Sequence, residues 1–114
     1  MTRRCDIVIV DFPFTDSPQS RVRPAVIVQT NAFPDQHESV VVCQMTSDLS
    51  DALDVRVTLD PSAENGLRVK SQIMADMPVT IRRTRIGRKV GRLNPEEITR
   101  LDAALAFVMG LADY

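Results

Sequence analysis

Short runs of β-branched residues recur along the first half of the chain, separated by polar stretches. CDIVIVDF (5–12), PAVIVQT (24–30) and SVVVCQMT (39–46) are nearly continuous apolar runs, and DVRVTL (54–59) alternates apolar and polar positions. Runs of this length and composition, bounded by Pro, Ser, Asp and Gly, predict β-strands. We therefore expect at least four strands, with an exposed loop over FPFTDSPQSRVR (12–23).

The strand pattern weakens beyond residue 60. Asn65 followed by Gly66 predicts a turn, and SQIMADM (71–77) and PVTIRRTRI (78–86) are weaker strand candidates. Pro78 has no backbone N–H to donate to a neighbouring strand, so we expect it at a strand boundary or at a sheet edge.

The end of the chain follows a helical period instead. Asn94 is a favourable N-cap, Pro95 is tolerated at the first helical position, and two acidic residues follow at the positive end of the helix dipole. Four apolar residues then fall on one stripe of the helix: Ile98, Leu101, Leu105 and Val108. Several strands with one terminal helix predict a mainly β fold, a small, strongly bent antiparallel sheet or barrel with a C-terminal α-helix.

The composition fits one domain spanning residues 1–114, since 44% hydrophobic residues in this length can form one compact core. The formal net charge of −1 gives no indication of a nucleic-acid partner. The charges are unevenly distributed, however. Residues 1–67 contain 5 Lys/Arg and 10 Asp/Glu, whereas residues 68–100 contain 9 and 3, which predicts a basic and an acidic side.

Two cysteines, Cys5 and Cys43, are expected to be free thiols, because no dense cysteine framework or signal peptide accompanies them. The N-terminal apolar run, Ile7 to Val10, is far shorter than the ~20 residues that a membrane helix needs. These features predict a cytoplasmic protein without a membrane partner.

Several chemistries lack the residues they need. The single histidine, His37, lies in a polar stretch and is expected in a solvated loop, so a two-histidine ribonuclease within one subunit is excluded. Neither HExxH nor a pair of CxxC motifs is present, and the glycine patterns of nucleotide-binding loops are absent. We therefore expect no metal and no other cofactor.

Arginine and hydroxyl groups remain as candidates for chemistry. Arg23 precedes Pro24, which fixes the backbone at the start of an apolar strand, and a guanidinium matches the oxygens of a phosphate. Thr46, followed by Ser47, ends the third apolar run and could bind a phosphate oxygen. Each also has a simpler interpretation, as a solvated loop arginine and as a Ser/Thr turn. The basic run RRTRIGRK (82–89) could follow a nucleic-acid backbone or protect an edge strand.

Together these stretches resemble the MazF/PemK (Kid-type) toxins of bacterial toxin–antitoxin systems. The resemblance covers nearly the whole chain and rests on DIVIVDFPFTDSPQSRVRPAVIVQTN, VVVCQMTSD, NGLRVKSQIMADMPVTIRRTRIGRKVGRL and NPEEITRLDAALAFVMGL. Its most specific element is an order of motifs: D-x-x-x-V-D-F, a polar loop, R-P-A-V-x-V, and a strand ending in Thr-Ser.

The resemblance implies an SH3-like β-barrel of the CcdB/MazF/Kid type, acting as a homodimer that cuts single-stranded RNA without a metal. In that mechanism the 2′-hydroxyl of the RNA attacks the adjacent phosphorus and leaves a 2′,3′-cyclic phosphate and a 5′-hydroxyl. By position, Arg23 and Thr46 match the catalytic arginine and threonine of the family, and Ser17 matches the serine near the scissile phosphate. Further candidate substrate contacts are Gln19, Ser20, Arg21, Ser47, Asp76, Arg82, Arg83 and Arg85. The implied protein partner is a cognate antitoxin with an acidic, partly disordered segment.

Three positions depart from the family pattern. Cys5 stands where glycine is usual, which affects a turn, while Met77 and Arg82 replace a glutamine and an aspartate, which bears on base preference. Two alternatives stay open. One is a gyrase poison of the CcdB type, although that activity depends on a C-terminal tryptophan and this chain has none. The other is a catalytically silent barrel that binds RNA or protein.

Overall fold

The computed structural model describes residues 2–12, 22–34, 37–52 and 54–112. Within these ranges six strands form one antiparallel sheet, and a single α-helix, α1 (Pro95–Val108), follows them. A short 3-10 helix, η2 (Arg83–Arg85), separates the last two strands. The strands are β1 (Asp6–Asp11), β2 (Val22–Ile27), β3 (Ser39–Thr46), β4 (Arg56–Leu59), β5 (Ser71–Arg82) and β6 (Ile86–Arg92).

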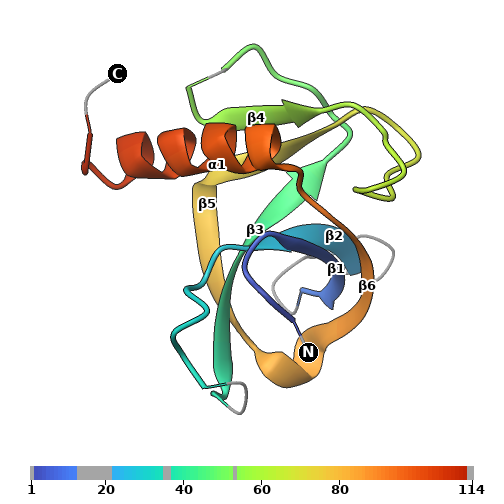
Figure 1. The fold of residues 1–114 in the computed structure, drawn as a ribbon, viewed down its shortest axis with the longest axis vertical. Helices are drawn as coiled ribbons and strands as arrows, with labels where there is room; N and C mark the ends of the chain where they lie inside the picture. The colour runs from blue at the N-terminus through green and yellow to red at the C-terminus, as the bar shows by residue number, and fades with distance from the viewer. Residues whose placement is uncertain (1, 13–21, 35–36, 53, 113–114) are drawn as a thin grey trace.

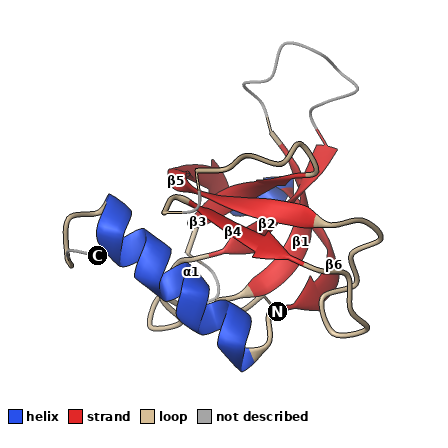
Figure 2. Ribbon diagram, turned by 90° about the horizontal axis from the view of Figure 1, so that it is seen from above, coloured by secondary structure: helices blue, strands red, loops and turns tan. Residues whose placement is uncertain are grey.

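The sheet has the strand order β4-β5-β3-β2-β1-β6 and curls strongly upon itself (Figure 1). Every pair of neighbouring strands is antiparallel. Helix α1 lies along the outside of the sheet and contacts β4 and β5 (Figures 1 and 2). The predicted fold class, a mainly β fold with a C-terminal helix on a small bent barrel, is confirmed.

The curl explains why the first apolar runs do not alternate with polar residues. Successive residues of a strand point to opposite faces, and here both faces of β1 are covered. Ile7 belongs to a cluster of buried residues that includes Leu101 and Ala104 of α1. Val8 and Val10 belong to a second cluster with buried residues of β2 and β3. A strand that is buried on both faces must be apolar at nearly every position.

Helix α1 begins as the sequence predicts. The Asn94 side chain accepts a hydrogen bond of 2.8 Å from the backbone N–H of Glu97, and the Glu97 carboxylate accepts one of 2.9 Å from the Asn94 N–H. This reciprocal capping box satisfies two backbone donors that the helix itself cannot pair. On the predicted stripe Leu101 is fully buried, Ile98 and Leu105 pack partly against the core, and Val108 lies outside that cluster.

The region around β5 and β6 confirms one expectation, the edge position of Pro78, and corrects another. Pro78 does not mark a strand boundary, because β5 continues through it for 12 residues. It pairs with Cys43 of β3, while the described pairing with β4 ends at Met74, so Pro78 lies where β5 has a strand on one side only. The sheet tolerates its missing N–H at such a local edge. The correction concerns the end of the predicted strand 78–86: η2 interrupts it, and β6 extends to Arg92.

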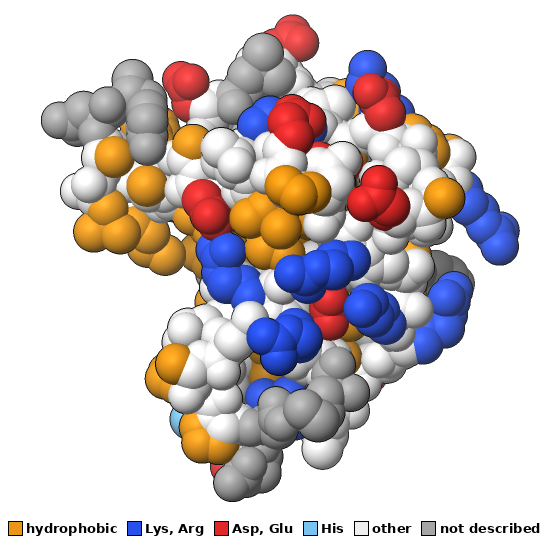
Figure 3. All heavy atoms as spheres, in the orientation of Figure 1, with side chains coloured by type: hydrophobic (Ala, Val, Ile, Leu, Met, Phe, Trp, Pro, Cys, Tyr) orange, Lys and Arg blue, Asp and Glu red, His pale blue; other side chains and the backbone are white. Residues whose placement is uncertain are grey.

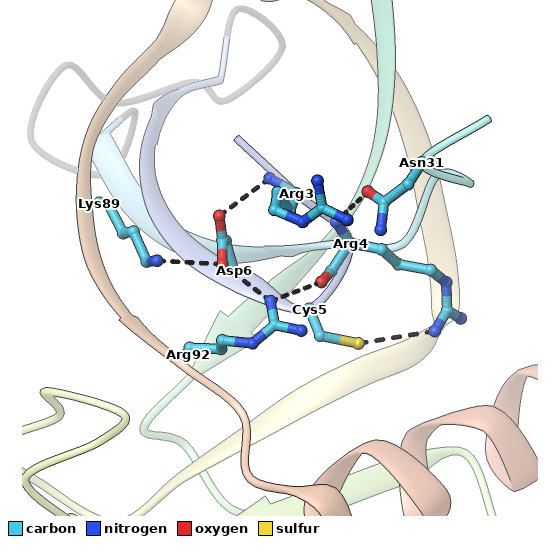
Figure 4. A network of polar contacts seen from close by, with 7 residues as sticks. All are labelled: Arg3, Arg4, Cys5, Asp6, Asn31, Lys89 and Arg92. Atoms are coloured by element: carbon cyan, nitrogen blue, oxygen red, sulfur yellow. Dashed lines mark hydrogen bonds and ion pairs between the residues drawn. The ribbon is translucent and has the colours of Figure 1, made fainter. Parts of the chain in front are cut away.

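The start of β1 is fixed to the end of β6 by a buried carboxylate (Figure 4). Asp6, only 1% exposed, accepts a 2.9 Å hydrogen bond from the Arg3 backbone N–H and a 3.0 Å ion pair from Arg92. Lys89 approaches the same carboxylate at 3.3 Å. Cys5, just before it, has a φ of 73°, in the left-handed region that favours glycine. The glycine that the family resemblance implies at this position would adopt this φ without strain.

Candidate active site

Arg23 is the second residue of β2 and is held there by β1. It pairs in register with Val10 of β1, and Pro24 follows it. The next residue, Ala25, pairs with Gln44 of β3. Because β2 and β3 are antiparallel, this register brings the Arg23 end of β2 beside the Thr46 end of β3. Two residues that are 23 positions apart in the sequence thus meet at one end of the sheet.

The Thr46 side chain closes a turn at the end of β3. Its Oγ1 accepts a hydrogen bond of 3.0 Å from the backbone N–H of Asp48, which is the Ser/Thr turn expected from the sequence. A hydroxyl that accepts in this way still has its own hydrogen to donate. The turn therefore fixes the oxygen in place and leaves the O–H available to a phosphate oxygen.

Arg23 and Thr46 line the same open cavity, with a volume of about 510 Å³. Its walls come from β1, β2, the end of β3, the start of β5, β6 and the segment 66–69. Among the described residues that line it, three are arginines and none is acidic. They are Ile9, Arg23, Pro24, Met45, Thr46, Ser47, Gly66, Leu67, Arg68, Val69, Ser71, Arg88 and Val90. Such a cavity favours an anion that can also accept a hydrogen bond from a hydroxyl.

Four predicted site residues lie outside the described residues. They are Ser17, Gln19, Ser20 and Arg21. Ser47, by contrast, is exposed and lines the cavity next to Thr46.

The structure does not place the remaining predicted contacts on the described lining of this cavity. Asp76 is exposed on β5, 4.0 Å from the Nε of Arg56. Arg82 forms a 3.0 Å ion pair with Glu38. Arg83 donates a 2.8 Å hydrogen bond to the backbone carbonyl of His37, and Arg85 lies 3.3 Å from the Asp11 carboxylate. His37 itself is exposed, with its ring 4.7 Å from the ring of Phe33, and is likewise not among those lining residues.

Two arginines of the cavity were not singled out from the sequence. Arg68 follows the Asn65-Gly66 turn, and Arg88 lies within the basic run 82–89. For Arg88 the only signal in the sequence was the basic run 82–89 as a whole, and the other basic residues of that run do not line the cavity. Which arginine of the run faces the cavity depends on η2 and on the register between β6 and β1, which the sequence pattern does not reveal.

A second hollow, of about 470 Å³, lies between α1 and β4. Its two arginines already have acidic neighbours: Arg56 lies 4.0 Å from Asp76, and Arg100 is 2.7 Å from Glu96. Apolar side chains, including the partly exposed Phe107, form much of the rest of the wall. The Arg23 cavity is therefore the better candidate for phosphate chemistry.

The two thiols do not take part in the cavity. Cys5 and Cys43 are free, as predicted, and the structure shows that both are buried. Burial, with a smaller contribution from the Asp76 carboxylate, raises the pKa of Cys43 to about 12, and burial also raises the pKa of Cys5. Both remain protonated at neutral pH, so neither is an activated nucleophile.

Two features are absent from the described residues. No three His, Cys, Asp or Glu side chains cluster there in a way that could hold a metal ion. In the same part of the chain, no helix is long and apolar enough to cross a membrane.

Comparison with known proteins places this architecture in a family. Residues 3–109 match the model of the PemK-like, MazF-like toxins of type II toxin–antitoxin systems. A probable endoribonuclease MazF from Mycolicibacterium smegmatis is 34% identical over 90 residues, which cover 79% of this chain and 82% of that protein. The endoribonuclease EndoA of Bacillus subtilis is 26% identical over 116 residues, covering 100% and 99%.

Solved structures show the same fold. An endoribonuclease from a mycobacterial species, in complex with its cognate antitoxin, superimposes with a TM-score of 0.82 over 100% of both chains. The sequence identity in this pair is 21%, so the similarity concerns the fold.

Proposed function

The chain belongs to the PemK-like, MazF-like toxins of type II toxin–antitoxin systems and, like the relatives it matches, is an endoribonuclease; we propose that it cuts single-stranded RNA at the cavity lined by Arg23 and Thr46. The observation that carries this proposal is that these two side chains line one cavity that has no acidic residue on its described lining. Cleavage is sequence-selective and needs no metal ion.

The proposed reaction uses the substrate's own nucleophile. The 2′-oxygen bonds to the adjacent phosphorus, the bond from phosphorus to the 5′-oxygen breaks, and the products carry a 2′,3′-cyclic phosphate and a 5′-hydroxyl. The 2′-hydroxyl loses its proton, and the leaving 5′-oxygen gains one. Arg23 stabilises the negative charge that builds on the phosphoryl oxygens, and the Thr46 hydroxyl donates a hydrogen bond to one of them. Both groups are most useful when that charge is largest, in the transition state.

The proposal extends to partners and location. In this proposal the cognate antitoxin covers the toxin with an acidic segment that folds on binding. A protein of the same fold has been solved in complex with its cognate antitoxin. The chain works as a homodimer in the cytoplasm. A segment of this kind excludes RNA because it presents carboxylates to the arginines that would hold phosphates.

The test of the reaction is a cleavage assay in EDTA. The purified chain is incubated with a long unstructured RNA, and the new 5′ ends are labelled with polynucleotide kinase without prior phosphatase treatment. We expect cleavage, and we expect the label because the 5′ ends are hydroxyls. Arg23→Ala should lower the rate by ~10²–10³, the usual effect of losing one donor to a transition-state oxyanion. Arg3→Ala, which removes an exposed arginine outside the cavity lining, is the matched control.

Other outcomes reject the proposal. An Arg23→Ala variant that cleaves as fast as the wild type removes Arg23 from the chemistry. Retardation of the RNA without cleavage identifies a silent binding barrel, and gyrase trapped on DNA identifies a poison of the CcdB type. Loss of cleavage in EDTA that returns with Mg²⁺ contradicts the metal-independent mechanism.

A further inference from the structure

Most basic side chains in the described part of the chain are neutralised within the molecule. Arg4, Arg82, Arg85, Arg92, Arg100 and Lys89 each lie within 3.3 Å of a carboxylate oxygen, and Arg56 and Lys70 lie 4.0 Å and 3.9 Å from one. Arg68 and Arg88 are different: both are exposed, and neither forms a side-chain hydrogen bond or ion pair with the described residues. An uncompensated arginine is free to bind an anion from outside.

Arg68 and Arg88 line the same cavity as Arg23 and Thr46 but enter it from other elements. Arg68 belongs to the segment between β4 and β5, and Arg88 lies near the start of β6. They therefore extend the positive lining of the cavity beyond the point where Arg23 and Thr46 meet.

The segment that carries Arg68 is built into the fold by a buried asparagine. Asn65 is 0% exposed, and its Oδ1 accepts hydrogen bonds from the backbone N–H groups of Ser62 (2.9 Å) and Leu67 (3.0 Å). Its Nδ2 donates a 2.8 Å hydrogen bond to the carbonyl of Asp60. The position of the backbone just before Arg68 is thus fixed by three hydrogen bonds to one side chain.

Two glycines let this segment lie directly on the strand that carries Arg88. A side chain at Gly66, whose φ is +69°, would overlap the backbone of Val90, and one at Gly91 would overlap the backbone of Asn65. The Arg92 N–H also donates a 2.9 Å hydrogen bond to the Glu64 carbonyl. The two arginines are therefore carried by backbones that pack closely together, which limits how far their guanidinium groups can separate.

Protection of an edge strand is the simpler explanation for Arg88, because β6 is an edge of the sheet. It does not explain Arg68, which is not on a strand, nor why both residues line the cavity of Arg23. Lys89, the neighbour of Arg88 on the same edge strand, is already paired with Asp6.

We propose that Arg68 and Arg88 bind the phosphates that flank the scissile phosphate of single-stranded RNA. This inference rests on the proposed function and adds to it two binding residues that hold the RNA backbone without reading its bases. Arginine suits the role because its planar donors match phosphate oxygens. The two residues contribute equally to the ground state and to the transition state, whereas Arg23 acts mainly in the transition state.

The test measures how RNA binding depends on salt. The probe is a fluorescent 20-nucleotide RNA pool of random sequence with 2′-O-methyl groups, which lacks the attacking hydroxyl and cannot be cut by the proposed mechanism. The slope of log Kobs against log salt concentration changes by about 0.7 for each phosphate contact to a single strand. We expect Arg68→Gln and Arg88→Gln to make the slope shallower by about 0.7 each, and the double variant by about 1.4. In cleavage assays each should raise KM and leave kcat near the wild-type value.

The matched controls are Arg3→Gln, which removes the same charge outside the cavity lining, and Arg68→Lys with Arg88→Lys, which keep the charges. Arg3→Gln should keep the wild-type slope, and the lysine variants should retain most of the wild-type slope.

A wild type that cleaves RNA while the glutamine variants keep its slope and KM overturns the inference and leaves the proposed function intact. The inference is also overturned if the glutamine variants keep the wild-type RNA slope but bind a 20-residue polyglutamate more weakly than the wild type does. The two arginines would then bind an acidic peptide. A wild type that neither binds nor cleaves RNA overturns both.

Discussion

At the scale of single residues, Thr46 has two tasks that use different parts of one hydroxyl. The oxygen closes the turn by accepting the N–H of Asp48, and the hydrogen is available to the cavity. The structural and the catalytic interpretation of this residue are therefore compatible. Substitutions that remove the hydroxyl affect both tasks, and substitutions that keep it affect neither.

Thr46→Val tests the catalytic task because valine keeps the shape and removes the hydroxyl. We expect kcat to fall by ~10², since a positioned donor to the transition state is lost. The midpoint of thermal unfolding should fall only slightly, because one exposed turn hydrogen bond contributes about 1 kcal/mol. Thr46→Ser, which keeps the O–H, should recover most of the activity. Steady-state kinetics with melting curves separate the two effects, and an active Thr46→Val would remove the hydroxyl from the mechanism.

At the scale of elements, α1 shows how a local signal becomes a stable helix. Its capping box lies within four residues, from Asn94 to Glu97, so the same residues that predict the helix start also form it. The segment between β4 and β5 is different. Its shape depends on the buried Asn65 and on the close approach of β6, and only the turn at Gly66 is visible in the sequence.

Asn94→Ala measures the contribution of the cap to stability. The substitution removes the acceptor for the Glu97 N–H, and we expect the free energy of unfolding to fall by about 1 kcal/mol. For a chain of this size the melting temperature should decrease by about 4 °C. Asn94→Ser or Asn94→Asp, which retain a capping oxygen, should lose much less. RNA cleavage at 25 °C should not change, since Asn94 is not among the described residues that line the cavity.

At the scale of the whole molecule, charges of opposite sign are separated. On the face drawn in Figure 3, basic side chains gather below α1, over β1 and β6, and acidic side chains lie mostly above them. Two basic residues of β6, Arg92 and Lys89, are paired internally with Asp6. Hence only some of the basic side chains on the surface remain available to bind an anion.

The global stability should decrease at alkaline pH because of Cys43. Burial raises the pKa of its thiol from 9.0 to about 12. Below pH 9 the thiol is protonated in both the folded and the unfolded chain, so its contribution is constant. Between pH 9 and 12 the unfolded chain releases the proton and the folded chain retains it, so stability falls by up to about 1.4 kcal/mol per pH unit.

Urea unfolding of the wild type and of Cys43→Ala at pH 7, 9 and 10.5 tests this expectation. Cys43→Ala is less stable at pH 7 because it removes buried side-chain volume. The difference between the two proteins should narrow between pH 9 and 10.5, since only the wild type has the thiol. A constant difference over this range would contradict the burial of a neutral thiol, as would rapid alkylation of the native protein at pH 8.

The local structure followed from the sequence because it depends on neighbouring residues. The strands of the first half, the Asn65-Gly66 turn, the capped helix and the free state of the thiols were all predicted, and the family resemblance extended these to the fold. The edge position of Pro78 was predicted. The continuation of β5 through Pro78 to Arg82 and the extent of β6 were not predicted, because sequence pattern alone does not tell how many partners a strand has at a given point. That number is fixed by the curl of the whole sheet, which places a local edge of β5 at Pro78.

By itself, the sequence determined the chemical groups present and the elements that carry them, because propensity, capping and turn formation act over a few residues. Only the tertiary structure decided which groups face one cavity. The register of β2 and β3 brings the Arg23 end beside the Thr46 end, and the packing of Asn65 and Gly66 on β6 adds Arg68 and Arg88. The tertiary structure also pairs Arg82 with Glu38 and Arg85 with Asp11. These outcomes depend on contacts between residues far apart in the chain, which a linear pattern does not contain.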